Sequence, residues 1–397
     1  MANRLDSLID QYGCPDSLID HWDGKSTGYA IWGYDDVIIW DQSGLVISNK
    51  KVDSSLKLVQ NTINDWKNQS NGISCLGFIN YNFKNILYPH IKFKKKNSKI
   101  PYLVFVKPKF IKRYKIEENF SNKVSLKMTK DFIDFNNYKI IINNIKEELK
   151  NGNVYQINFT GHKQYQSSNS GLDVYMYLRS KVKPKYGFYF KYNKYEILSF
   201  SPELFFKRVG NHIESHPMKG TIRRDINLKI DNQLKLDLKN SIKDRAEHLM
   251  IVDLMRNDLG KIASPGTVKV DELYVIKSYR TVHQMISKIS GKVDNSINEI
   301  DILKALFPGG SITGAPKESA MKIIDYLEDY SRDIYTGSLG YIESNGNMNF
   351  NIAIRTMTKK EEIFSYGVGG GIVWDSIAEN EWDEAQLKSK ILSSIIK

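Results

Sequence analysis

The chain has 397 residues, 41% of them hydrophobic, so it can bury a large core as one domain or two. Its 57 Lys and Arg residues outnumber its 45 Asp and Glu residues, giving a net charge of +12. Two cysteines far apart argue against a disulfide framework or a cysteine-based zinc site, and no apolar run predicts a signal peptide or a membrane span. We therefore expect a cytoplasmic globular enzyme with no membrane partner.

Part of the positive charge is concentrated in residues 92–115, where residues 94–96 are three consecutive lysines. A basic run of this kind can bind nucleic acid, so a nucleic-acid-binding protein is one alternative function. No recognition-helix or RNA-binding motif accompanies the run, and a solvated strand and loop face explains it more simply. We therefore expect no nucleic-acid partner.

The chain divides into a motif-poor first part and a motif-rich second part. Residues 1–124 show strand-like patterns, for example at 28–32, with a helix expected over 56–66. Residues 125–397 begin with a helix expected over 131–151 and continue with alternating strands and helices. We predict a β-rich N-terminal part and a catalytic second part that intertwine in one domain.

Segment 198–221 predicts two strands joined by a tight turn at residues 210–211. A turn centred there places Glu203 opposite Lys219, with Cβ atoms roughly 5 Å apart. On spacing alone, a cross-strand salt bridge is the simpler interpretation. Gly220 favours a functional site, because it lets a ligand approach the backbone, and a lysine beside a carboxylate can be a nucleophile or carry a proton.

Two pairs of acidic residues have the i, i+3 spacing that places both side chains on one face of a helix. Asp244 and Glu247 lie in a helix expected over 243–260, and Glu381 and Glu384 lie near the C-terminus. Such pairs are commonly solvated surface. Two facing pairs could instead hold a partly hydrated Mg²⁺ that also binds a substrate carboxylate.

Two glycine-rich turns are expected, at 307–316 and at 367–371. The first leads into a helix near Pro316 whose free N–H groups favour an anion, and the second offers successive backbone N–H groups to a carboxylate. A purely structural turn is an equal alternative for each. Arg355 lies on an otherwise apolar expected strand, so it needs an anionic partner, for which a bound carboxylate is well suited.

Seven short motifs resemble, in order, those of the chorismate-utilising enzymes, the family of the anthranilate, aminodeoxychorismate, isochorismate and salicylate synthases. The motifs occupy residues 152–158, 201–203, 217–221, 244–247, 309–316, 354–356 and 367–371. The resemblance implies an α+β sandwich, with two large, mainly antiparallel sheets packed at a steep angle and helices on the outside. The first 120 residues match the family only loosely.

Two positions divide the chemistry within this family. Gln156 stands where water-adding members have a lysine base, so the resemblance implies ammonia as the nucleophile. Lys219 stands where anthranilate-forming members typically have alanine, and it matches the members that make 4-amino-4-deoxychorismate for 4-aminobenzoate and folate biosynthesis, the aminodeoxychorismate synthase component I group. The nearest alternative is the anthranilate synthase large subunit of tryptophan biosynthesis.

The resemblance also implies a substrate, a partner and a role for each matched residue. The substrate is chorismate, Lys219 is the nucleophile, Glu203 is a proton donor with a raised pKa, and Gln156 is the third catalytic residue. Neither cysteine has the glycine context of a glutaminase nucleophile, so a separate glutaminase subunit is implied as the ammonia source. The residues that match chorismate-binding positions are Thr221, His283, Thr313, Tyr335, Arg355, Gly369, Gly370 and Lys388.

The metal implied by the resemblance is Mg²⁺. Glu247 and Glu384 match direct ligands of the ion, and Asp244 and Glu381 match carboxylates that hold its bound waters. All four are oxygen donors, the ligands that Mg²⁺ prefers.

Overall fold

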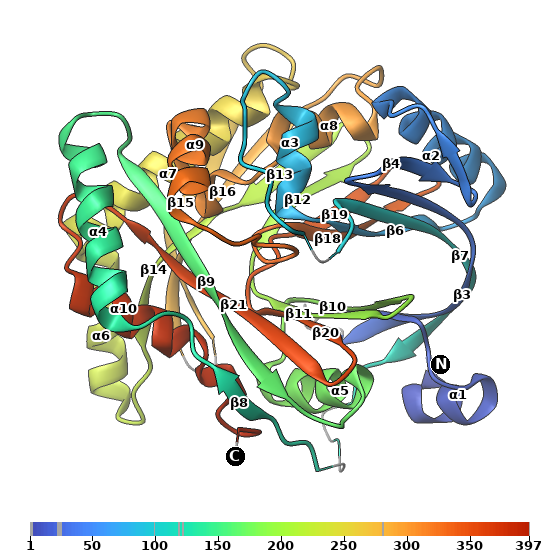
Figure 1. The fold of residues 1–397 in the computed structure, drawn as a ribbon, viewed down its shortest axis with the longest axis horizontal. Helices are drawn as coiled ribbons and strands as arrows, with labels where there is room; N and C mark the ends of the chain where they lie inside the picture. Colours follow the sequence, from blue (N-terminus) through green and yellow to red (C-terminus); the bar gives the residue numbers. More distant parts are fainter. Residues whose placement is uncertain are drawn as a thin grey trace.

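The computed structural model describes residues 3–21, 26–98, 100–117, 120, 123–279 and 282–396. The strands of these segments join into one hydrogen-bonded sheet that folds over into two layers (Figure 1). Among the paired strands that the structure describes, only β1 and β7 run parallel. The expected arrangement of mainly antiparallel layers with helices outside is confirmed, with the difference that the two layers are continuous.

The first layer contains the strands nearest the two glycine-rich segments. In spatial order these are β8 (Lys127–Lys130), β9 (Gln156–Gln166), β21 (Ile363–Ile372), β20 (Thr356–Lys360), β11 (Tyr195–Ser201), β10 (Tyr186–Tyr192), β2 (Ser17–His21) and the start of β3 (Thr27–Asp41). Two short strands lie at its margins, β17 (Gly314–Ala315) against β9 and β1 (Asn3–Arg4) against the end of β7.

The second layer runs from the other half of β3 to the strand that carries Lys219. Its spatial order is β5 (Lys50–Val52), β4 (Gly44–Ile47), β3, β7 (Leu103–Lys115), β6 (Ile73–Ile79), β18 (Ser338–Glu343), β19 (Met348–Asn351), β12 (Leu204–Val209), β13 (His212–His216) and β16 (Val282–Lys292), with β14 (Met218–Arg223) and β15 (Lys269–Ser278) both beside β16.

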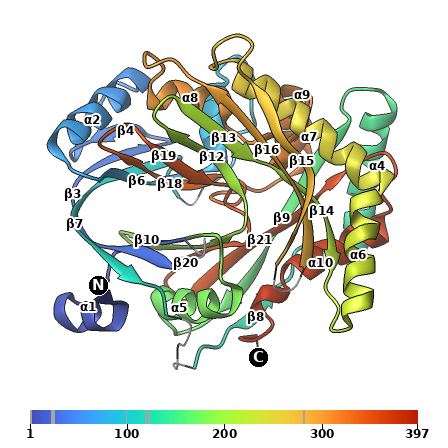
Figure 2. The same ribbon diagram turned by 180° about the vertical axis from the view of Figure 1, so that it is seen from behind.

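The long strands β3 and β7 belong to both layers, because they pair along most of their length and bend together (Figure 2). The register of this pair shifts between Tyr34 and Asp36. Gly33 there has a φ of 69°, which glycine adopts without the strain that a side chain imposes. Because they bend, β3 and β7 connect the two layers along one edge of the sandwich.

Helices cover the outer face of each layer. The second layer packs against α2 (Leu56–Gln69), α3 (Lys84–Leu87), α7 (Ile242–Gly260) and α8 (Glu299–Leu306), and the first packs against α1 (Leu5–Tyr12), α4 (Phe135–Lys150), α5 (Gly171–Val182), α9 (Lys317–Leu327) and α10 (Ala378–Lys388). Helix α6 (Leu228–Asn240) lies against β14, β15 and β16. The described segments also contain the 3₁₀ turns η1 (Tyr81–Phe83), η2 (Gly310–Ile312) and η3 (Lys390–Leu392).

Buried apolar side chains of the described residues form three cores, one under each helical layer and one between the sheets. Strand β10 shows how one sequence serves two of them. Its Phe188 and Phe190 face the core between the sheets, whereas Tyr189 faces the helices, because successive side chains point to opposite faces of a strand. Strands buried on both faces have little polar alternation, which explains their continuous apolar sequence.

The elements expected from the sequence are present with shifted ends. The helix expected over 56–66 is α2, which continues to Gln69. The helix expected over 131–151 begins only at Phe135, because the Asp134 side chain accepts a hydrogen bond from the backbone N–H of Asn137 and caps the helix there.

Strands from the two sides of residue 124 alternate in the sheet. Strand β2 pairs with β10, and β6 pairs with β18, so the N-terminal strands are part of the same ladders as the later ones. The sheet therefore continues across residue 124. The division of the chain into a diverged part before this residue and a catalytic part after it stays a prediction. Among the described residues, no helix has the length and apolar character needed to cross a membrane.

We expect Phe190→Ala to lower the free energy of unfolding by about 3–5 kcal/mol, because it opens a cavity between the two layers. Phe190 is fully buried in the core between the sheets. Urea unfolding followed by tryptophan fluorescence measures this loss. Val209→Ala is the control, since Val209 is 50% exposed and its truncation removes little buried surface. Equal losses in the two variants would contradict this account of the core.

Candidate active site

Side chains from β14, α7 and β9 converge over one glycine of β21. On β14, Lys219 places its Nζ 3.1 Å from Oε2 of Glu247 on α7. A Cβ atom on Gly371 would lie 2.5 Å from the same Nζ and 3.2 Å from Nε2 of Gln156 on β9. The missing side chain of Gly371 is therefore what lets the lysine amine and the glutamine amide approach each other.

The amide of Gln156 has an unusual environment for a buried polar group. The residue is fully buried, and within the described part of the chain neither its Oε1 nor its Nε2 has a hydrogen-bond partner. Leaving such a group unpaired costs roughly 1–3 kcal/mol, and most buried amides are paired. An amide held at this cost beside a lysine amine is suited to binding a small polar ligand.

The glycine-rich segment 367–371 is part of strand β21, so the expected turn is wrong. It pairs with β9 along its length, for example Gly369 with Thr160. The glycines are needed for close packing on the strand. A Cβ atom on Gly367 would overlap the ring of Tyr335, and one on Gly369 would lie 2.3 Å from the carbonyl oxygen of Phe159.

Glu203 lies buried just before β12, with 4% of its surface exposed. Burial raises the pKa of Glu203 to about 7, although hydrogen bonds from Ser311 and from the backbone of Met218 act in the opposite direction. The Ser311 hydroxyl donates to Oε1 of Glu203 at 2.8 Å. The raised pKa expected for a proton donor is confirmed.

The expected pairing of Glu203 with Lys219 across a hairpin is wrong. The turn at residues 210–211 forms as expected, but the β12–β13 ladder ends at Leu204 and His216. Pro217 follows and has no backbone N–H to continue the ladder. Lys219 therefore belongs to the next strand, β14, which pairs with β16, and its ion pair is with Glu247.

Each predicted acidic pair is on a helix, and one carboxylate of each pair is paired with lysine. Oε1 of Glu247 lies 3.8 Å from Nζ of Lys243, in addition to the contact with Lys219. On α10, Oε1 of Glu384 lies 2.8 Å from Nζ of Lys388, and Glu381 accepts a hydrogen bond of 2.7 Å from the Ser376 hydroxyl. Asp244 packs against Gly220, beside Lys219.

The charges of α7 and α10 act on one common region. Lys388 is the main cause that lowers the pKa of Glu384 to about 2, and Lys219 and Lys243 lower it further. Burial raises the pKa of Glu381 and so does the neighbouring Glu384, while the same two lysines oppose the rise. The carboxylates of both helices thus lie within electrostatic reach of the same two ammonium groups.

These carboxylates have the oxygen chemistry that Mg²⁺ prefers, and their charge suits a cation. They are not drawn together into a metal cage, since no group of three His, Cys, Asp or Glu side chains in the described segments lies close enough to hold a metal ion. The donor set therefore fits Mg²⁺ by the chemistry of its oxygen atoms alone, with lysine ammonium groups as the present counter-charges.

Three of the residues matched to chorismate binding surround the glycine strand. The Lys388 amine donates to the carbonyl oxygen of Gly369 at 2.8 Å, and a Cβ atom on Gly370 would lie 3.5 Å from the same amine. The Tyr335 ring packs on Gly367. Arg355 is near enough to lower the pKa of Tyr335, which burial raises overall.

Arg355 lies in the connection between β19 and β20, so its expected place on a strand is wrong. Its φ of 50° is in the left-handed region, which a regular strand excludes. Across the described ranges, no carboxylate forms a salt bridge with its guanidinium. A cation without an internal counter-charge, beside Tyr335, is suited to binding an anion.

The remaining residues matched to chorismate binding differ in how accessible they are to a ligand. They are Thr313, His283 and Thr221. The fully buried Thr313 donates its hydroxyl to the carbonyl oxygen of Gly309 at 2.9 Å, so it shapes the glycine-rich loop. Both ring nitrogens of His283 are engaged, by Ser278 and by Asp231. Thr221 is exposed on β14, two residues from Lys219, where the register of the strand shifts between Met218 and Thr221.

The sequence reasoning did not identify Ser311, Lys243 or Arg332. Ser311 follows the two glycines of the 307–316 loop, and Lys243 directly precedes the first acidic pair. Neither position has a spacing that marks it without the fold. Arg332 is fully buried, and its burial is decided by tertiary packing alone.

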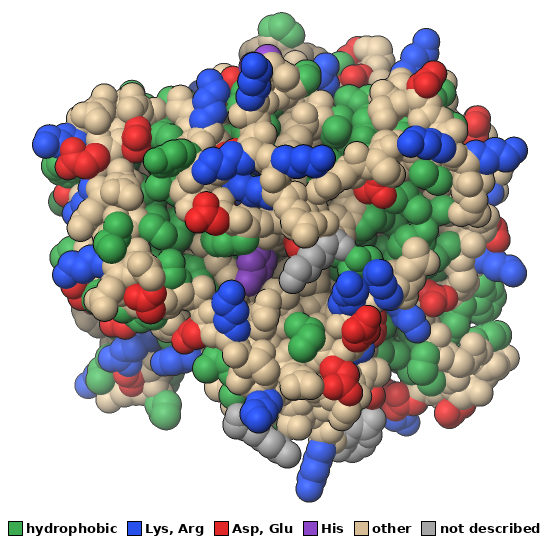
Figure 3. All heavy atoms as spheres, in the orientation of Figure 1, with side chains coloured by type: hydrophobic (Ala, Val, Ile, Leu, Met, Phe, Trp, Pro, Cys, Tyr) green, Lys and Arg blue, Asp and Glu red, His purple; other side chains and the backbone are tan. Residues whose placement is uncertain are grey.

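The face of the molecule drawn in Figure 3 does not favour the nucleic-acid alternative. On the face shown in Figure 3, Lys and Arg side chains are scattered among acidic and hydrophobic ones and form no continuous basic groove. Lys96, from the lysine run, is partly buried and pairs with Asp325 at 3.2 Å. The run is therefore in part a structural feature.

Comparison with known proteins places these features in a family. Residues 109–394 match the family model described as chorismate binding enzyme. The chain is 41% identical over 261 residues to anthranilate synthase component 1 of Saccharolobus solfataricus, and 42% identical over 236 residues to aminodeoxychorismate synthase component 1 of Salmonella typhimurium. These alignments cover 66% and 59% of this chain but only 62% and 52% of the two relatives.

A solved structure shows that the fold is shared over nearly the whole chain. The crystal structure of anthranilate synthase component I from Streptococcus pneumoniae superposes with a TM-score of 0.81. It covers 92% of this chain and 91% of that one, at 24% identity. The N-terminal part, which resembles the family only loosely in sequence, therefore has the family's architecture.

The wild type should lose free energy of unfolding as the pH rises, because Glu203 has a raised pKa. We expect Glu203→Gln to remove this loss. Folded Glu203 keeps its proton up to a pKa of about 7, whereas the unfolded carboxyl loses it near 4.5. The stability contributed by the raised pKa is therefore complete below pH 4.5 and is lost as pH rises through 7. Relative to the wild type, the variant should gain up to roughly 3 kcal/mol between pH 4.5 and pH 8.

Urea unfolding of both proteins at pH 4.5 and pH 8 measures this difference. Ser311→Ala is a useful companion, because it removes the hydroxyl that donates to Glu203 without removing the titrating group. If the free energies of unfolding of the wild type and Glu203→Gln differ by the same amount at both pH values, the raised pKa of Glu203 is contradicted.

Proposed function

We propose, because this chain belongs to the chorismate binding enzyme family, that it aminates chorismate with ammonia to form 4-amino-4-deoxychorismate. One observation carries the proposal: the Lys219 amine and the unpaired Gln156 amide meet over Gly371. A cytoplasmic role in 4-aminobenzoate and folate biosynthesis is part of the same proposal. Support comes from the relatives of about 40% identity that are named aminodeoxychorismate synthase component 1.

The reaction proceeds through two displacements in which the lysine enters and then leaves. The Lys219 amine, which must first leave its ion pair with Glu247 and lose a proton, attacks C2 of chorismate. The C4 hydroxyl departs as water after it takes the proton of Glu203, whose pKa of about 7 keeps it an acid near neutral pH. Ammonia held by the Gln156 amide then attacks C4, the bond to Lys219 breaks, and the new amine loses a proton.

We include Mg²⁺ in the proposal, held by Glu247 and Glu384, with Asp244 and Glu381 binding its waters. When bound, the ion supplies positive charge that steadies the ring carboxylate of chorismate. The neighbouring lysines can release these carboxylates to a cation, because each ion pair is partly exposed to solvent. Arg355, Tyr335 and Lys388 then remain to bind the second carboxylate of the substrate.

The ammonia source is proposed to be a separate glutaminase subunit. Cys14 is exposed and Cys75 is buried in β6, and neither has the glycine context of a nucleophile elbow. The relatives named component 1 imply a second component for the same activity.

Anthranilate formation is the second candidate, and the 41% identity to an anthranilate synthase component 1 favours it. The two activities differ in their products from one substrate. Mass spectrometry of the products formed from chorismate, ammonium and Mg²⁺ distinguishes 4-amino-4-deoxychorismate from anthranilate directly, and finding only anthranilate would exclude the first candidate.

We expect Lys219→Ala to reduce 4-amino-4-deoxychorismate formation by roughly a thousandfold or more, because the covalent route is lost. The products of wild type and variant are quantified by mass spectrometry with saturating ammonium. Lys288→Ala is the matched control, since Lys288 also pairs with a glutamate, Glu214 at 2.8 Å, away from the proposed site. Product formation by Lys219→Ala at the wild-type rate would remove Lys219 as nucleophile.

We expect Glu384→Gln to weaken Mg²⁺ binding by roughly tenfold or more, equivalent to at least about 1.4 kcal/mol of lost ligand charge. Isothermal titration calorimetry with MgCl₂ measures this without turnover. The control is Glu379→Gln on the same helix, because Glu379 is exposed and pairs with Lys139 at 3.0 Å. Equal Mg²⁺ affinity in both variants would show that Glu384 is not a ligand.

A further inference from the structure

One arginine lies buried behind the proposed site and touches three of its segments. Arg332 has 1% of its surface exposed, and Nε and Nη2 each bind one carboxylate oxygen of Glu328 at 2.7 Å. Nη1 donates to the carbonyl oxygen of Ile312 at 2.9 Å, and Nη2 donates to that of Asn158 at 2.6 Å. A weaker bond of 3.3 Å joins Nη1 to the Thr336 hydroxyl.

The partners of Arg332 other than Glu328 each lie within two positions of a residue of the proposed site. Asn158 is two positions beyond Gln156 on β9, Ile312 directly precedes Thr313, and Thr336 directly follows Tyr335. Three segments that are far apart in sequence are thus fixed by the donors of one planar group. A lysine could not replace it, because a single ammonium lacks the rigid fork that binds a carboxylate and two carbonyls together.

Glu328 extends the network to the same strand. Its Oε1 accepts hydrogen bonds from the backbone N–H of Thr160 at 3.0 Å and from the Thr160 hydroxyl at 2.9 Å. The buried pair therefore holds β9 at two points, Asn158 and Thr160, on the stretch that begins with Gln156. Breaking such a pair leaves a buried charge without a partner, so the network resists displacement.

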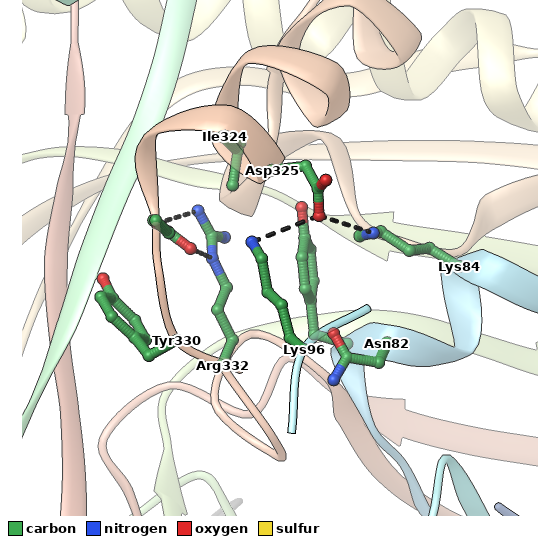
Figure 4. Close-up of a pocket in the computed structure, with 9 residues that line it drawn as sticks. Asn82, Lys84, Lys96, Ile324, Asp325, Tyr330 and Arg332 are labelled. Atoms are coloured by element: carbon green, nitrogen blue, oxygen red, sulfur yellow. Dashed lines mark hydrogen bonds and ion pairs between the residues drawn. The ribbon is translucent and has the colours of Figure 1, made fainter. Parts of the chain in front are cut away.

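The N-terminal part of the chain supports the arginine from its other side. Figure 4 shows Arg332 near Lys84, Lys96 and Asp325 in a compact charged cluster. The guanidinium carbon lies 4.5 Å from the centre of the Tyr81 ring, and Asp325 is 3.2 Å from the Lys96 amine. Residues before position 100 therefore contribute to the back wall of a site whose working side chains all come later.

We propose that Arg332 is a positioning residue, which together with Glu328 sets the relative placement of Gln156, Thr313 and Tyr335. The inference rests on the proposed function, because it treats these three residues as contacts of ammonia and chorismate. Arg332 itself touches neither reactant. Its effect is transmitted by the carbonyl oxygens of Asn158 and Ile312, so its loss should misplace the site without removing any group that reacts.

The test compares Arg332→Lys with Arg179→Lys. Arg179 is a similarly buried arginine on α5, away from the proposed site. Its Nη1 contacts both carboxylate oxygens of Asp20, at 3.2 and 3.0 Å. Both variants lose the guanidinium of a buried ion pair, so both should unfold at lower urea concentration. Only Arg332→Lys should lower kcat/KM for chorismate and for ammonium, by roughly 100-fold per folded molecule, as expected for a misplacement of about 1 Å.

Chemical rescue gives a readout that a purely structural role would not change. Millimolar guanidinium chloride, far below denaturing concentrations, should restore part of the activity of Arg332→Ala and leave that of Arg179→Ala unchanged. Equal kcat/KM for the two lysine variants, each corrected for its folded fraction, would overturn the proposal.

Hydrogen–deuterium exchange separates this inference from the proposed function. Segments 156–160 and 310–314 should exchange faster in Arg332→Lys than in the wild type, and at the wild-type rate in Arg179→Lys, whether or not chorismate is the substrate. Faster exchange in Arg332→Lys, together with a wild type that does not aminate chorismate, would disprove the function alone. Unchanged exchange in Arg332→Lys would disprove the positioning role alone.

Discussion

The pairing of β9 with β21 is the constraint on which the rest of the site depends. The ladder runs from Gln166 and Ile363 to Ile157 and Ile372, and it brings the Gln156 end of β9 beside the glycines of β21. Because those glycines have no side chains, Lys219, Tyr335 and Lys388 can approach the strand from different elements. An alanine at position 371 would meet the Lys219 amine, so the close approach requires glycine.

The electrostatics of the site follow from this crowding. Four carboxylates on α7 and α10 and three lysines share a partly exposed region, in which Glu247 and Glu384 are each paired with lysine. A dianionic substrate and a divalent cation together would replace these internal pairs without changing the net charge. The site is therefore in a balanced state in which lysines and carboxylates can exchange their partners for ligands.

Glu203 takes no part in these ion pairs between lysines and carboxylates. It is buried, and its hydrogen bonds come from the Ser311 hydroxyl and from the backbone of Met218, the residue before Lys219. Burial without a cationic partner raises its pKa, whereas the charged neighbours of Glu384 lower the pKa of that residue. Two carboxyl groups of similar chemistry thus have pKa values shifted in opposite directions by their surroundings alone, which suits the different roles proposed for them.

The sequence by itself determined the residue types, their order and, through resemblance to a family, the fold and the proposed chemistry. It located the helices carrying the acidic pairs, since i, i+3 spacing is a local property, and it placed the turn at residues 210–211. It could not determine that Lys219 pairs with Glu247 instead of Glu203, because Pro217 moves the lysine to the next strand. Nor could it indicate that residues 367–371 form a strand or that Arg332 binds three distant segments, because these depend on which strands become neighbours, and only the tertiary structure decides that.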